Sequence, residues 1–171
     1  MNMRRVAAVL VCAFLAPLSA HSAERKPLTG WGTVRFGMSH DEVSRVLNGQ
    51  VYEHGPYILN HEVTIEGSPF EVIFFFVGKN NTLTNIQISN VARTKSSELC
   101  AENRIQKFAP SLKAKYGEPD SFERHADTAH TTYIYDFPNA LVTYGTTLLD
   151  DKCIFTVNYR LKDAPKPKAT F

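Results

Sequence analysis

Histidine and carboxylate spacings are the first places to look for catalysis in this sequence. His61 and Glu62 begin like the zinc-binding pattern HExxH, but Ile65 stands where the second histidine is required. The sequence also lacks a Gly-x-Ser-x-Gly elbow, a Gly-rich phosphate loop and a CxxC pair. The other histidines after the N-terminal leader are scattered: His40, His54, His125 and His130. We therefore expect no catalytic, cofactor-binding or metal-binding residue, and an enzyme is only the third choice of function.

The N-terminus has the pattern of a secretory signal peptide. Arg4 and Arg5 form a short basic head, and the apolar run Val6–Leu18 is too short to span a bilayer. Small residues follow, so we expect cleavage between Ala20 and Ala23 and assign residues 1–23 to the leader. We predict an exported, periplasmic protein with no later transmembrane segment.

Cysteine usage fits that compartment. Cys12 lies inside the leader and follows Val11, which does not match a lipobox, so we predict no lipid anchor. Cys100 and Cys153 remain, and an even pair in an oxidising space predicts a disulfide. It would close a loop of about 54 residues and stabilise the fold by about 4 kcal/mol in the chain-entropy account. Two free, buried thiols are the alternative.

Charge excludes two classes of partner. The chain of 171 residues has 19 Lys and Arg against 17 Asp and Glu, a formal charge of +2. The excess is Arg4 and Arg5, so the exported part is formally neutral. Binding to nucleic acid or to an anionic membrane normally needs a clustered basic excess. We expect neither partner.

Aromatic residues are the better candidates for binding. The chain has 11 Phe, 7 Tyr and 1 Trp, and most of them must fill the core. We select Trp31, between two glycines, and Tyr144 as candidate protein-contact residues, because Trp and Tyr are enriched at interfaces. For Trp31 the alternative is a local plug of the core.

Two units follow the leader. The first, residues 24–92, opens with a polar lead-in over 24–29 that we expect to be mobile. A helix starts after Ser39, which forms a capping box with Glu42. Three strands are then expected at Glu62–Glu66, Phe70–Val77 and Leu83–Val91.

The second unit, residues 93–162, has a similar pattern. A helix is expected over Ser97–Tyr116, kinked or split at Pro110. Strands are expected at Ser121–Arg124 or Thr131–Phe137, at Leu141–Tyr144 and at Cys153–Leu161. Residues 163–171 read as a mobile tail. The predicted fold class is α+β: a tandem repeat of a helix plus a three-stranded antiparallel meander, with the helices packed on one face of an antiparallel sheet.

A short motif links this pattern to known families. Gly37-Met38-Ser39-His40-Asp41-Glu42-Val43 resembles the opening of the outer-membrane assembly lipoproteins of the BamE (SmpA/OmlA) family, and Leu83-Thr84-Asn85-Ile86 is similar to the strand that closes their module. The pairing of two units resembles β-lactamase-inhibitor proteins. The motif Lys115-Tyr116-Gly117-Glu118-Pro119 is similar to small exported bacterial proteins of unassigned activity.

This resemblance implies a structural role and transfers no functional residue. We predict a non-catalytic periplasmic protein-interaction module of the bacterial cell envelope, which binds a periplasmic or envelope protein as a monomer or weak homo-oligomer. The alternative is an inhibitor or immunity protein that blocks a cell-envelope hydrolase. That alternative requires one tight partner and a contiguous hot-spot surface.

Overall fold

The computed structural model describes residues 25–48, 51–54, 57–65, 68–77, 80–92, 108–125, 130–149 and 152–164. One short helix, α1 (His40–Val46), and a helical segment at residues 108–116 accompany ten strands in the described part of the chain. The strands are β1 (Gly30–Trp31), β2 (Val34–Arg35), β3 (Tyr52–His54), β4 (Tyr57–Ile65), β5 (Ser68–Val77), β6 (Thr82–Ala92), β7 (Ser121–His125), β8 (His130–Asp136), β9 (Ala140–Leu149) and β10 (Lys152–Leu161).

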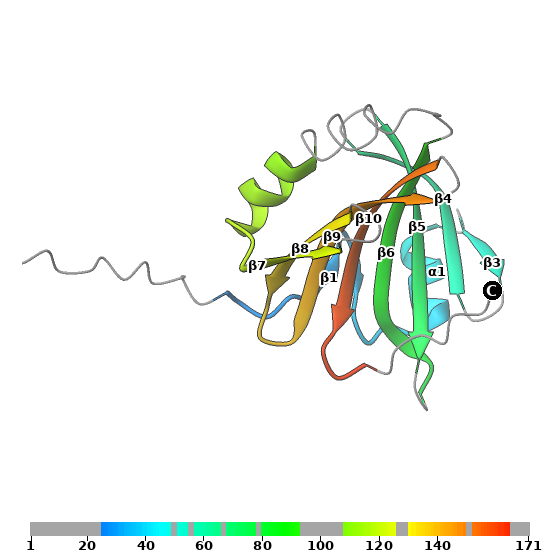
Figure 1. The fold of residues 1–171 in the computed structure, drawn as a ribbon. Coiled ribbons are helices and arrows are strands. Elements are labelled where there is room, and N and C mark those ends of the chain that lie inside the picture. Colours follow the sequence, from blue (N-terminus) through cyan, green and yellow to red (C-terminus); the bar gives the residue numbers. More distant parts are fainter. Residues whose placement is uncertain are drawn as a thin grey trace, which may run out of the picture.

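A single large sheet dominates the molecule. Its eight strands lie in the order β3-β4-β5-β6-β10-β9-β8-β7, and every neighbouring pair is antiparallel. Two four-stranded meanders, β3–β6 and β7–β10, are joined where β6 pairs with β10 (Figure 1). As a result, β3 and β7, the first strand of each meander, form the two edges of the sheet.

The predicted fold class is wrong. The protein is mostly β, its meanders have four strands rather than three, and the two described helical segments are too short to form a helical layer. Ser121–Arg124 and Thr131–Phe137 were treated as alternatives, but both regions form strands, β7 and β8. β7 is short, and its residues Ser121–Arg124 are all exposed, so it lacks the apolar alternation that identifies strands in a sequence.

The predicted helix start at Ser39 is confirmed. The Ser39 side chain accepts a hydrogen bond from the Glu42 backbone, and the Glu42 carboxylate accepts one from the Ser39 backbone at 2.8 Å. Two backbone hydrogen bonds tie the preceding turn to β6, from Gly37 N to Leu83 O (2.9 Å) and from Leu83 N to Met38 O (2.8 Å). These bonds orient α1 so that Val43 is fully buried in the core.

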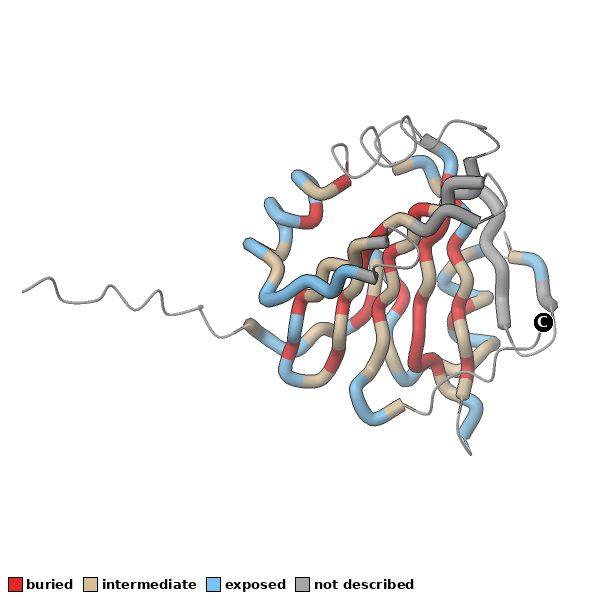
Figure 2. Tube along the Cα trace, viewed as in Figure 1, coloured by how far each residue is buried: buried red, intermediate tan, exposed pale blue. Residues whose placement is uncertain are grey.

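One face of the sheet carries the core, and we call it the inner face. Strict alternation on β5 buries Phe70, Val72, Phe74 and Phe76 there. Phe70 meets Phe108 edge to face at 4.7 Å between ring centroids, and Phe108 stacks on Phe155 at 5.1 Å. This cluster connects β5, the helical segment and β10, and burial is concentrated along the central strands (Figure 2).

The N-terminal lead-in is held in place, contrary to the expected mobility. Leu28 N donates to Asn139 Oδ1 (2.8 Å), and Asn139 Nδ2 donates to Leu28 O (2.9 Å). Arg25 donates to the Glu118 carbonyl at 2.7 Å and forms an ion pair with Asp120. Within the described residues, no helix is long and apolar enough to cross a membrane.

Candidate functional site

A pocket lies between the helical segment 108–116 and the inner face of β8 and β9. Its volume is about 550 Å³, within the size range of small-molecule and side-chain binding pockets. Most of its wall is apolar. The lining residues are Ala109, Pro110, Lys113, Glu118, Pro119, Tyr133 and Tyr144.

Two stacked tyrosines form the sheet side of the pocket. The rings of Tyr133 and Tyr144 lie 4.8 Å apart and within 14° of parallel, on directly opposed residues of β8 and β9. Tyr144 is only 4% exposed, and burial, followed by the proximity of Tyr135 and Tyr133, raises the pKa of its phenol above the usual value. The phenol is therefore neutral at physiological pH and offers a flat surface for packing.

The two charged residues of the pocket lining, Lys113 and Glu118, neutralise each other's charge. The Lys113 ammonium forms an ion pair with the Glu118 carboxylate across the helix end. Next to them, Asp120 is held by Arg25 and accepts a hydrogen bond from Asp136 N at 2.6 Å. Since these charges are matched, the pocket favours an uncharged, apolar occupant over an ionic one.

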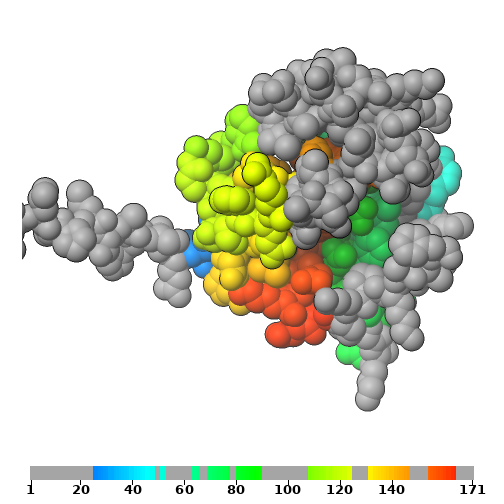
Figure 3. Space-filling view, viewed as in Figure 1, coloured from blue at the N-terminus to red at the C-terminus, as the bar shows by residue number. Residues whose placement is uncertain are grey.

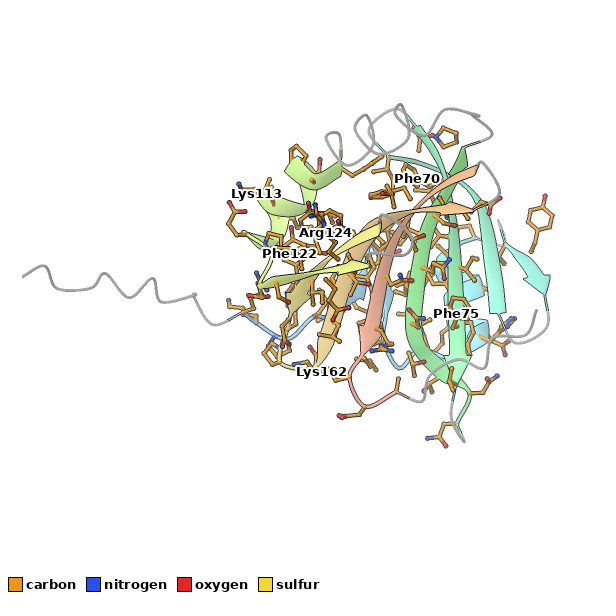
Figure 4. The ribbon with its side chains drawn as sticks, viewed as in Figure 1. Phe70, Phe75, Lys113, Phe122, Arg124 and Lys162 are labelled. Carbon is orange, nitrogen blue, oxygen red and sulfur yellow. The ribbon has the colours of Figure 1, made fainter. Side chains whose placement is uncertain are left out.

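The edge strand β7 lies beside the pocket. Its residues Ser121, Phe122, Glu123 and Arg124 are all exposed, and Phe122 is 67% exposed, more than any other large apolar residue whose burial the structure describes. The Phe122 ring lies 6.4 Å from that of Tyr133. Figure 4 shows Phe122, Arg124 and Lys113 between β7 and the helical segment, and Figure 3 shows the yellow-green atoms of this part of the chain at the surface.

Phe122 is the exposed end of a row of residues that runs across the inner face from β7 to β5. The register opposes each member directly to the next: Phe122, Tyr133, Tyr144, Val157, Ile88 and Val72. Exposure falls from 67% at Phe122 to zero at Val72. Phe122 thus lies in line with core residues, and among the described residues no further strand covers it.

The two residues predicted to contact a partner are not brought together. Tyr144 forms part of the pocket wall on β9, whereas Trp31 lies in the separate two-stranded sheet of β1 and β2, half-buried against the core. Their contact role stays a prediction. The predicted disulfide lies outside the described residues, because Cys100 is not among them and only the backbone of Cys153 is placed, opposite Ala92 and Leu148.

Sequence reasoning missed the residues that define the pocket and the edge. The sequence predicts only a kink at Pro110, places Pro119 only in a motif shared with other exported proteins, and assigns Phe122 and Arg124 only to one of two alternative strands. The one available signal was Phe122 itself, a lone aromatic among Ser121, Glu123 and Arg124. Among the residues that the structure describes, no group of three His, Cys, Asp or Glu side chains could hold a metal ion.

Comparisons with known proteins assign no activity. No family model matches the chain, and no curated protein matches it. The chain is similar to a solved structure of a DUF4309 family protein, YjgB, from Bacillus subtilis, at 15% identity and a TM-score of 0.44, with 80% of this chain and 86% of the other covered. A TM-score of this size does not establish a shared fold.

Proposed function

We propose that this chain is a non-catalytic protein-interaction module of the bacterial cell envelope, exported by its leader, and that it binds an extended segment of a partner protein along β7. The observation that carries the proposal is the exposed edge strand with Phe122 beside an apolar pocket. From the sequence, the resemblance of the motif Gly37–Val43 to the BamE family is the feature that favours the same class of role.

The geometry of β7 suits strand addition. An edge strand presents backbone N–H and C=O groups that have no partner within the sheet, and many proteins bind extended peptides on such edges. The ladder between β7 and β8 is regular over all five residues of β7, as the shorter β3–β4 ladder at the opposite edge is over its three. A regular edge presents the outward-facing N–H and C=O groups of every second residue to an incoming strand.

Phe122 supplies an apolar contact to accompany those hydrogen bonds. Fully burying a phenylalanine side chain stabilises by about 1.5–3 kcal/mol, and two-thirds of this side chain is still accessible. The pocket behind it offers stacked phenol rings, two prolines and an ion-paired lysine, a set suited to packing against apolar groups. These features favour binding over chemistry.

Substitution at the two edges of the sheet tests this proposal. Phe122→Asp on β7 should abolish co-purification of the partner with the mature protein. The matched control is Tyr52→Asp on the opposite edge strand β3, where Tyr52 is 62% exposed, and it should leave the partner bound. Equal binding by both variants, with unchanged melting temperatures, would exclude β7 as the binding site.

A further inference from the structure

The inner face of β7 carries two exposed side chains of different chemistry. Phe122 and Arg124 are two positions apart on one strand, so both project from the same face, the one that borders the pocket. Lys113 is already ion-paired with Glu118, whereas the described residues hold no ion-pair partner for Arg124. The edge therefore combines an uncovered ring with an unbalanced positive charge.

From this arrangement we infer the chemistry of the bound segment: it carries a large apolar residue and an acidic residue two positions apart, the first opposite Phe122 and the second opposite Arg124. The inference rests on the proposed binding of a segment along β7. In an antiparallel complex the segment reads acidic-x-apolar from its N-terminus, and in a parallel complex it reads apolar-x-acidic.

The apolar position follows from the row on the inner face. A residue on an incoming strand directly opposite Phe122 becomes the next member of the row that already contains Phe122, Tyr133 and Tyr144. Directly opposed side chains in a sheet pack against each other, and aromatic pairs are among the most favourable. A small side chain would leave the Phe122 ring accessible to water, so we expect Phe, Tyr, Leu or Met rather than Ala.

The acidic position follows from electrostatic complementarity. A carboxylate opposite Arg124 would neutralise the one charge on this part of the inner face that the structure leaves unbalanced within its described residues. A basic residue at that position would face Arg124 directly and would be disfavoured. Because the pair is exposed, it contributes more to selectivity than to affinity.

A peptide library displayed on phage tests the inference on the full mature protein. Selection on the wild type should enrich an acidic and a large apolar residue at the predicted spacing. Selection on Arg124→Glu should replace the acidic preference with a basic one and keep the apolar preference. A selected peptide should bind Arg124→Glu about two- to fivefold more weakly than the wild type.

The remaining outcomes separate this inference from the proposed function. In one outcome, selected peptides no longer bind Phe122→Asp, but the charge preference is the same for the wild type and for Arg124→Glu. That result overturns the inference and leaves strand addition along β7 in place. If the peptides bind Phe122→Asp as well as the wild type, β7 is not the site and both fail. If the purified variant Phe122→Cys forms a dimer that is cross-linked through the new cysteine, a second copy binds on β7, and the inference is also overturned.

Discussion

Three buried tyrosine phenols on the inner face make the stability of the fold depend on pH. Burial is the main cause that raises the pKa of Tyr135, Tyr144 and Tyr159. A group whose pKa is higher in the folded than in the unfolded state stabilises the fold fully below the unfolded pKa, here about 10. That stabilisation is lost as the pH rises, because the unfolded chain releases the proton first.

We therefore predict that these phenols leave the free energy of unfolding unchanged through neutral pH. Above about pH 10 their ionisation in the unfolded chain should decrease it. Urea melts at increasing pH would measure this. Tyr144→Phe removes one of the three phenols and should reduce the alkaline decrease. An unchanged slope in Tyr144→Phe would mean that this phenol is not buried as described.

The capping box gives a prediction at the scale of one element. Ser39→Ala removes the acceptor for the Glu42 backbone N–H at the start of α1, and loss of such a cap destabilises by about 1 kcal/mol. Urea denaturation should show this decrease. Since α1 is far from β7 in the fold, partner binding below the melting temperature should be unchanged (Figure 1). A stability equal to that of the wild type would contradict the cap.

The β1–β2 hairpin depends on a glycine at a close backbone approach. A Cβ at Gly30, where φ is +149°, would lie 2.2 Å from Val34 O, so Gly30→Ala must displace the hairpin. Gly32 is the matched control, with φ of +58° and open space around the added carbon. We predict a clearly larger decrease in melting temperature for Gly30→Ala, because only that substitution adds a clash with backbone to the conformational strain.

At the scale of the whole molecule, the two meanders share one core. Phe155 on β10 packs with Phe70 from the first meander and with Phe108 from the helical segment. Phe155→Ala should lower the free energy of unfolding by about 3–5 kcal/mol. Fluorescence of Trp31 and far-ultraviolet circular dichroism should still report one coincident transition. Two separate transitions would mean that the meanders unfold independently.

Local features of the fold could be predicted from the sequence, whereas features that depend on tertiary contacts could not. Local hydrogen bonds could be predicted from the sequence: the capping box formed by Ser39 and Glu42 is confirmed. The central strands were predicted from their apolar residues, such as those of β5, because positions buried in the core require apolar side chains. The edge strand β3 was not predicted, and Ser121–Arg124 was predicted only as an alternative to Thr131–Phe137, since none of these four residues is buried. The pocket was missed because it depends on Pro110, Tyr133 and Tyr144 meeting across three elements, and neither periodicity nor motif spacing contains that tertiary contact.

Site-specific photo-cross-linking in cells tests the central claim most directly. A photoreactive phenylalanine analogue would replace Phe122 on β7 and, as the control, Tyr52 on β3. We predict an adduct at position 122 that maps to one extended segment of one envelope protein and disappears when a proline is placed in that segment, because proline cannot complete the ladder. The absence of an adduct at position 122, or the same adducts at both positions, would contradict the account.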